Sequence, residues 1–319
     1  MSRPRVVFMG TPEFAVPALA AVAGACEVVA VVTQPDRPRG RGLECLPSAV
    51  SLEAERLGLP ILKPERVNTP ELVAQLAALG PDLFAVVAFG AILKPELLRV
   101  PRLGAINLHG SLLPDYRGAA PVQRALWDGR AYSGVTTLWM DAGIDTGDVI
   151  LQRWASIGAA DDAGTLAASL ASLGAPLLAD SLTLAMAGRA PRRPQDRAAG
   201  SYAGKLAKRD GEVDWTLDAV TVWNHQRAVT PWPGAAASIQ GRRITLLAAR
   251  PLDLLPRAEA AGTVLESAGD AVVVACGRGA LALERVKPGD RGAMGAAEWA
   301  RGARLAAGAT FEVVKEAHA

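Results

Sequence analysis

The chain has 319 residues, of which half are hydrophobic and 21% are charged, and its formal net charge is +2. This length allows two domains, and the composition is typical of a globular protein rather than a disordered or fibrous one. Three widely spaced cysteines argue against a disulfide framework and favour a reducing compartment. No apolar run approaches the length of a membrane span, and the first run is too short for a signal peptide. We therefore expect a cytoplasmic protein that does not enter a membrane.

Short apolar runs alternate with amphipathic stretches in the first half of the sequence. Buried strands are predicted at 6–9, 28–32, 83–88 and 105–107, and helices at 48–57 and 70–79. Thr69 is a candidate N-cap, with Pro70 at the first helical position. This order predicts an α/β fold with a Rossmann-like, mostly parallel sheet and helices on both faces. The turn at Gly10 lacks the glycine pattern of a dinucleotide site, which argues against a nucleotide-dependent dehydrogenase.

The second half begins after a stretch rich in Pro, Arg and Gly at 188–200, which is typical of an interdomain linker. Beyond it, β-like runs at 235–239, 243–248, 262–265, 271–275 and 280–286 accompany one helical stretch at 218–228. Five short strands in about a hundred residues predict a small barrel or sandwich.

Positive charge is concentrated in one short segment. Residues 189–209 carry seven basic residues and one acidic residue, and a smaller cluster consists of Arg37, Arg39 and Arg41. Two interpretations stay open: a solvated linker with a solvated loop, or two basic elements that bind one polyanion.

An asparagine and a histidine two residues apart, Asn107 and His109, end the apolar run at 105–107. If this run is a strand, the two side chains point to the same face. Parallel α/β sheets bind ligands outside the carboxyl ends of their strands, so an amide and an imidazole there suggest a reactive site. The alternative is a buried histidine hydrogen-bonded to backbone.

A second polar segment, 141–150, places Asp141, Asp145 and Asp148 in a Gly-rich turn before another apolar run. One carboxylate facing the Asn/His pair would complete an acid–base site, but the residues alone do not say which one. The spacing fits neither an EF-hand nor a zinc site, so no metal is expected.

The segment INLHGSLLPDYRGAAPVQRAL together with DAGIDTGDVI resembles the folate-dependent formyltransferases. Four further stretches resemble the branch of that family that acts on an initiator tRNA: VVFMGTPEFAVPAL, QPDRPRGRG, SYAGKLAKRDGEVDW and TPWPGA. The resemblance implies formyl transfer from 10-formyltetrahydrofolate to the amino group of methionyl initiator tRNA, for translation initiation. It also implies a catalytic domain at 1–188, a basic linker at 189–207 and a C-terminal OB-like β-barrel that binds tRNA at 208–319.

Roles follow from the same resemblance. The amine attacks the formyl carbon directly, Asn107 and His109 donate to the oxyanion, and Asp145 orients His109 and accepts the amine proton. The residues expected to contact folate are Ser111, Leu112, Leu113, Pro114, Phe89, Gly90, Ile92 and Leu93. Those expected to contact tRNA are Arg41, Arg37, Arg39, Lys205, Lys208 and Arg209. The protein is expected to be a monomer without a metal.

Two rival functions share part of this pattern. A formyltransferase for a small amine, such as a glycinamide ribonucleotide, would use the same Asn/His/Asp set but would not need the basic segment or the second β-rich domain. A non-enzymatic RNA-binding protein would not need the Asn/His/Asp set, and aromatic residues for base stacking are few, at 5%.

Overall fold

The computed structural model describes residues 3–39, 44–196, 198–252, 259–289 and 291–312. The chain forms two compact units that interleave along the sequence. The first unit consists of Met1–Pro121, Tyr132–Ser156 and Ala167–Ala203, and the second consists of Val122–Ala131, Ile157–Leu166 and Gly204–Ala319. The segment expected as a linker is therefore packed with the first unit as far as Ala203.

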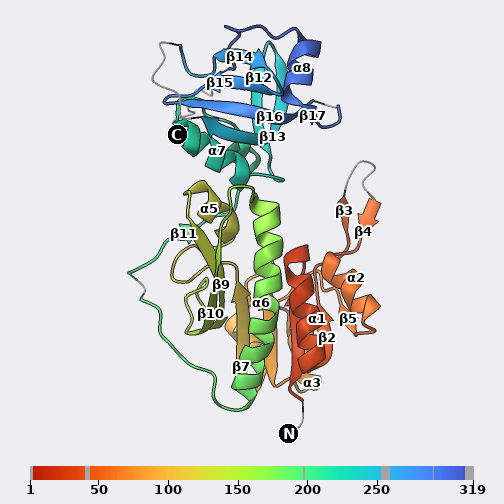
Figure 1. Cartoon of the computed structure of the whole chain (residues 1–319). Helices are drawn as coiled ribbons and strands as arrows, with labels where there is room; N and C mark the ends of the chain where they lie inside the picture. The colour runs from red at the N-terminus through yellow and green to blue at the C-terminus, as the bar shows by residue number, and fades with distance from the viewer. Residues whose placement is uncertain (1–2, 40–43, 197, 253–258, 290, 313–319) are drawn as a thin grey trace. The chain divides into compact units, whose positions relative to one another are not determined.

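The first unit is built on a seven-stranded sheet in the order β10-β9-β7-β6-β1-β2-β5 (Figure 1). Five neighbouring strands are parallel: β5 (Ile61–Leu62), β2 (Glu27–Val32), β1 (Arg5–Gly10), β6 (Leu83–Val87) and β7 (Gly104–His109). Two antiparallel strands, β9 (Tyr132–Trp139) and β10 (Val149–Ser156), extend the sheet beyond β7. The predicted mostly parallel sheet is confirmed.

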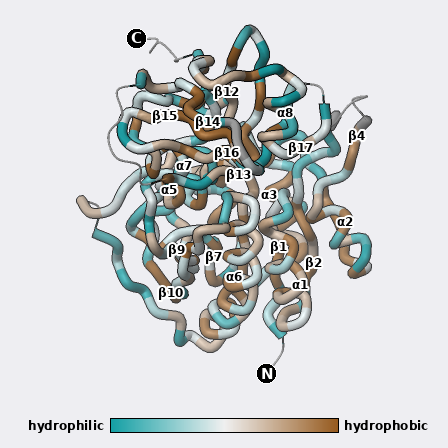
Figure 2. The backbone as a smooth tube through the Cα atoms, turned by 45° about the horizontal axis from the view of Figure 1, so that its top comes forward, coloured by the Kyte–Doolittle hydropathy of each residue, from teal (hydrophilic) through white to brown (hydrophobic). Residues whose placement is uncertain are grey.

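Helices cover both faces of this sheet because its central strands are apolar on both sides. In β1, Val7 and Met9 pack in one cluster with residues of α3 (Pro70–Ala78) and α4 (Pro95–Leu98). The remaining helices are α1 (Val16–Ala25), α2 (Ala49–Arg56) and α6 (Ala163–Met186). Figure 2 shows the strongly hydrophobic character of β2. Thr69 caps α3 as predicted, since its side chain accepts a hydrogen bond from the backbone N of Leu72.

The 24-residue helix α6 was not anticipated from the sequence. By length and composition alone it could cross a membrane, contrary to the expectation that no run is long enough, and half of its apolar window is buried. A core helix passes the same test, and α6 packs against the sheet. A Cβ on its Gly174 would lie 2.8 Å from the Leu108 side chain of β7, and the hydroxyls of Ser181 and Thr137 are 2.7 Å apart.

Two small paired elements complete the first unit. β3 (Arg37–Arg39) and β4 (Glu44–Leu46) form an antiparallel hairpin, and β8 (Arg117–Gly118) pairs in parallel with β11 (Tyr202–Ala203). The second pair ties the end of the segment 189–203 to the chain that follows β7.

The second unit contains an antiparallel curled sheet in the order β12-β13-β16-β15-β14, with β17 paired to β16. These strands are β12 (Ala235–Ile239), β13 (Arg242–Leu252), β14 (Val264–Ala268), β15 (Ala271–Ala275), β16 (Ala280–Pro288) and β17 (Met294–Gly295). Isolated bridges join the segment 310–311 to Ile239 at the end of β12 and to Thr263 beside β14. The two edges of the sheet thus share one connecting segment, which agrees with the barrel-like fold expected.

Helices α7 (Ala219–Ala228) and α8 (Ala296–Ala303) pack on this sheet, and α5 (Pro121–Trp127) is joined to it through Trp127. The apolar core includes Trp215 and Phe311, whose ring centroids are 5.0 Å apart. Asp218 caps α7 by accepting hydrogen bonds from the first-turn N–H groups of Val220 and Thr221.

Candidate active site

The Asn/His pair lies where the sequence predicted, at the carboxyl end of β7. Asn107 and His109 share a face of the strand, and the neighbouring strands β6 and β9 flank them in register. His109 is 6% exposed, and the side chain of Asn107 is half-buried. The strand geometry therefore presents an amide and an imidazole together at one edge of the sheet.

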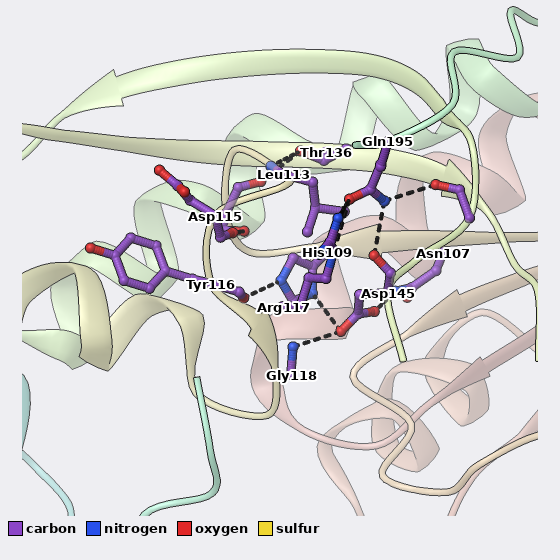
Figure 3. A network of polar contacts seen from close by, with 12 residues as sticks. Asn107, His109, Leu113, Asp115, Tyr116, Arg117, Gly118, Thr136, Asp145 and Gln195 are labelled. Atoms are coloured by element: carbon purple, nitrogen blue, oxygen red, sulfur yellow. Dashed lines mark hydrogen bonds and ion pairs between the residues drawn. The ribbon is translucent and has the colours of Figure 1, made fainter. Parts of the chain in front are cut away.

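Asp145 is the carboxylate that meets this pair (Figure 3). One oxygen, Oδ1, accepts from Asn107 Nδ2 at 3.1 Å, while Oδ2 accepts from the backbone N of Gly118 at 2.9 Å and lies 3.6 Å from His109 Nδ1. Asp145 has a positive φ of 54°, so a left-handed turn aims its side chain at β7. Of the three aspartates left open by the residues, the structure brings this one to the pair.

The other two aspartates have different partners. Asp141 accepts from the hydroxyl of Thr146 and from the backbone N of Gly143, which closes the loop on itself. Asp148 lies 3.7 Å from Arg192 in an ion pair. Within the described ranges, no group of three His, Cys, Asp or Glu side chains could hold a metal ion.

The His109 ring is fixed by contacts on both nitrogens. Nε2 lies 2.9 Å from the backbone oxygen of Tyr116. A carbonyl can only accept, so the hydrogen-bond network assigns a proton to Nε2. In a neutral ring, Nδ1 then carries a lone pair that faces Oδ2 of Asp145. The two alternatives for this histidine are thus combined: it is buried and bound to backbone, yet it also faces a carboxylate.

Two polar side chains of the antiparallel strands, Thr136 of β9 and Gln152 of β10, form hydrogen bonds with the loop Ser111–Pro114. The hydroxyl of Thr136 donates to Ser111 O at 2.7 Å and accepts from Leu113 N at 3.1 Å. Gln152 Nε2 donates to Leu113 O at 2.8 Å and to the same hydroxyl at 3.0 Å. The Leu113–Pro114 peptide is cis. Ser111 and Leu113 are buried, whereas Leu112 and Pro114 are half-buried.

The second group of residues expected to contact folate follows β6, and two of its four members are buried while two are exposed. Phe89 and Leu93 are each 3% exposed and belong to the apolar core, whereas Gly90 and Ile92 are exposed. Because β6 pairs with β7, this segment leaves the sheet beside the Asn/His pair. Its exposed members are the ones free to meet a ligand.

Sequence reasoning missed Gln195 and Arg117. Gln195 Nε2 donates to the backbone oxygens of Asp145 and Gly147, both at 2.8 Å, and its Oε1 accepts two hydrogen bonds from Arg117 (Figure 3). Gln195 lies 50 residues from Asp145 in a stretch that resembles a linker. The only sequence signal was its position within a segment noted for charge.

The basic residues expected to contact tRNA lie on separate elements. Arg37 is exposed and begins β3, and Arg39 ends that strand, while Arg41 lies outside the described residues. Lys205, Lys208 and Arg209 are exposed, the last two in a short 3-10 helix at Lys208–Gly211.

Comparison with known proteins gives a consistent family. Residues 5–182 match the family model described as "Formyl transferase", and residues 205–304 match "Formyl transferase, C-terminal domain". A protein of Stenotrophomonas maltophilia named methionyl-tRNA formyltransferase is 48% identical over 280 residues, covering 88% of this chain and 91% of its own. A protein of the same name from Heliobacterium modesticaldum is 45% identical, covering 96% and 99%.

Solved structures share the fold at lower identity. An N-formyltransferase of Helicobacter canadensis, in complex with folinic acid and dTDP-3-aminofucose, aligns with a TM-score of 0.67 at 18% identity, covering 91% of this chain and all of its own. HypX of Aquifex aeolicus in complex with tetrahydrofolic acid aligns with a TM-score of 0.61 at 19% identity, covering 94% and 47%. With both parts of the chain matched, the protein belongs to the formyl transferase family.

Proposed function

We propose that the protein transfers a formyl group from 10-formyltetrahydrofolate to the free amino group of methionyl initiator tRNA. The observation that carries this proposal is the convergence of Asn107, His109 and Asp145 at the end of β7, in a chain whose near full-length relatives are named methionyl-tRNA formyltransferases. The chemistry requires an oxyanion to be stabilised and an amine proton to be removed, and this site offers groups for both.

Asn107 is proposed as the first donor to the oxyanion. Its amide has two N–H groups, of which one is engaged by Asp145 Oδ1. The second can point at the formyl oxygen when the amine attacks the formyl carbon. Removing one such donor typically costs about 10²–10³ in rate. As the intermediate collapses, the bond between the formyl carbon and the folate nitrogen breaks, that nitrogen takes up a proton in exchange for the one lost by the amine, and tetrahydrofolate leaves.

His109 and Asp145 are proposed to take the amine proton as a pair. With Nε2–H bound to Tyr116 O, the remaining lone pair on Nδ1 and the carboxylate oxygen face each other across 3.6 Å. The amine proton can therefore be received at Nδ1, between the ring and the carboxylate. Both N–H groups of the protonated ring are then engaged, by Tyr116 O and by Asp145, so His109 acts on the oxyanion through its positive charge, which offsets the developing negative charge.

Folate is proposed to lie against the loop Ser111–Pro114 and the exposed part of the segment that follows β6. Cross-bracing by Thr136 and Gln152 keeps the first loop in one conformation, which reduces the entropy lost on binding a flat ring. Gly90 and Ile92 are exposed and Leu112 and Pro114 are only partly buried, so these four are its proposed contacts, while the buried Ser111, Leu113, Phe89 and Leu93 support them.

The second unit, with the exposed Lys205, Lys208 and Arg209, is proposed to bind tRNA together with the basic residues Arg37, Arg39 and Arg41. Cationic side chains displace counterions from a phosphate backbone, so binding should weaken steeply with salt. The domain roles expected from the sequence, catalysis before residue 188 and tRNA binding after 208, are kept within this proposal. We further propose that the enzyme works in the cytoplasm as a monomer.

The decisive experiment compares two amine acceptors. Labelled formyl from 10-formyltetrahydrofolate is offered to methionyl initiator tRNA and, separately, to glycinamide ribonucleotide, with wild type and Asp145→Asn. Transfer to the tRNA that falls by at least 10²-fold in the variant is the expected result. Transfer only to the small amine would overturn the tRNA assignment, and an unimpaired variant would overturn the role of Asp145.

A further inference from the structure

The loop that carries Asp145 has a tether on the side away from the reacting groups. The carboxylate faces Asn107 and the N–H of Gly118, but the backbone oxygen of Asp145 points to Gln195. The same amide nitrogen also reaches Gly147 O, so it spans the two carbonyls on either side of Thr146. Gln195 thus contacts the loop through two backbone carbonyls and not through the loop's side chains.

The Gln195 amide has all four of its hydrogen-bonding positions filled. Its two N–H groups donate to the carbonyls of Asp145 and Gly147, and its oxygen accepts from Nε and a terminal nitrogen of Arg117 at 3.1 and 3.0 Å. A flipped amide would put its oxygen against two carbonyls and its nitrogen against a guanidinium. The orientation of the amide is therefore unique.

Arg117 joins this amide to the segment that carries it. It also donates to the backbone oxygens of Asp196 and Ala199, and its own backbone lies in β8, paired with β11. Next to it, Gly118 supplies the N–H that holds Asp145 Oδ2. Two neighbouring residues thus connect both sides of Asp145: Gly118 binds the carboxylate directly, and Arg117 reaches the backbone through Gln195.

We propose that Gln195 is a positioning residue that fixes Asp145 for formyl transfer, with Arg117 fixing Gln195 in turn. Asp145 has a left-handed backbone, which a residue other than glycine keeps only when its surroundings hold it there. Two hydrogen bonds to the carbonyls of this turn supply that restraint. The role rests on the proposed function, because it acts on the carboxylate assigned there to proton transfer.

Two substitutions at this position separate positioning from folding. Gln195→Met keeps the length of the side chain and removes all four hydrogen bonds. Gln195→Glu keeps the two bonds from Arg117 and adds an ion pair, but turns an oxygen toward the two loop carbonyls, so the segment stays attached while the loop is released. Asp196→Ala is the control, since the exposed Asp196 side chain bonds only to the backbone of Ala198 among the contacts described.

The kinetic test measures kcat and both KM values for formyl transfer. Both Gln195 variants should lose about 10- to 100-fold in kcat, because small misplacements of a reacting group cost up to about 10²-fold, while KM for each substrate changes less than about 3-fold. Asp196→Ala should match wild type. A kcat within 2-fold of wild type for Gln195→Glu, or a loss confined to KM, overturns the proposal.

A second readout does not depend on the substrate. Hydrogen exchange of the backbone amides at 143–148 and at Gly118 should quicken in Gln195→Glu, while the strands β1 and β6 keep wild-type protection. Unchanged exchange in the loop overturns the positioning role even if activity is lost. If wild type fails to formylate the tRNA yet the loop exchanges faster in the variant, the proposed function fails and the tether stands.

Discussion

The buried hydroxyl of Thr136 offers the sharpest test of how the loop Ser111–Pro114 is held. It donates to Ser111 O, accepts from Leu113 N and Gln152 Nε2, and has no exposed surface. Thr136→Val preserves the shape of the side chain and removes all three hydrogen bonds. Ser111 O and Leu113 N are then left without this partner, whereas Leu113 O keeps its bond from Gln152.

The expected cost follows from those two backbone groups. Each buried polar group that loses its partner costs roughly 1–3 kcal/mol, and the loop recovers part of this by shifting toward water, so about 2–4 kcal/mol is expected. The wild-type loop conformation becomes correspondingly less populated. Folate affinity should fall about 10-fold or more, since about 1.4 kcal/mol corresponds to a factor of ten.

A neighbouring threonine provides the matched control. Thr137 is equally buried but points to the opposite face, where its hydroxyl meets Ser181 of α6 and Leu151 N. Thr137→Val should lower the melting temperature, by about 2–4 °C per kcal/mol lost, and leave folate affinity unchanged. Calorimetric titration with folate and thermal melts would measure both. Equal folate affinity in the two variants, at whatever value, would refute the reasoning.

Three further outcomes are expected. Burial lowers the pKa of His225 and outweighs the hydrogen bond to Asp210 O, which raises it, so the folded protein protonates this ring less readily than the unfolded chain does. The unfolded chain titrates near the ordinary value of 6.5 and binds more protons below it. The free energy of unfolding should therefore fall as the pH drops below about 6.5. In urea melts of His225→Gln, this free energy should depend less on pH than it does in wild type. Gly147→Ala should destroy the Asp145 loop, since the new Cβ would lie 1.7 Å from Trp139 O, and circular dichroism with activity would report misfolding or a complete loss of turnover. Asp218→Ala removes the cap of α7 and should cost about 1 kcal/mol in denaturant melts; an unchanged midpoint would contradict the cap assignment.

Local patterns predicted much of the fold. The apolar runs at β1, β2, β6 and β7 lie where expected, and Thr69 caps its helix. Both features were predictable because a strand buried on both faces and a helix cap each depend on residues that are consecutive in the sequence. Helix α6 was missed because its apolar residues are interspersed with Ala, Ser and Gly, whose packing against β7 appears only when the sheet is present.

The residues of the candidate site were likewise predictable only in part. Asn107 and His109 could be paired from the two-residue period of a strand, but choosing Asp145 required either a family resemblance or its left-handed turn. Gln195 and Thr136 act through carbonyl and N–H groups distant in sequence. Such contacts leave no periodic pattern, so the sequence does not show which residues form them.

The interleaving of the two units has a consequence for dissecting the protein. The segments 122–131 and 157–166 belong to the second unit although they precede most of it by tens of residues. Trp127 packs edge-on against His225, and the guanidinium of Arg227, which lies over Trp223, donates to the backbone oxygens of Gly158 and Asp161. A fragment starting at Gly204 would lack both segments and expose the surfaces they cover. During synthesis, the earlier segments must likewise wait for the last hundred residues before they find their partners, so the second unit completes its packing only late in translation.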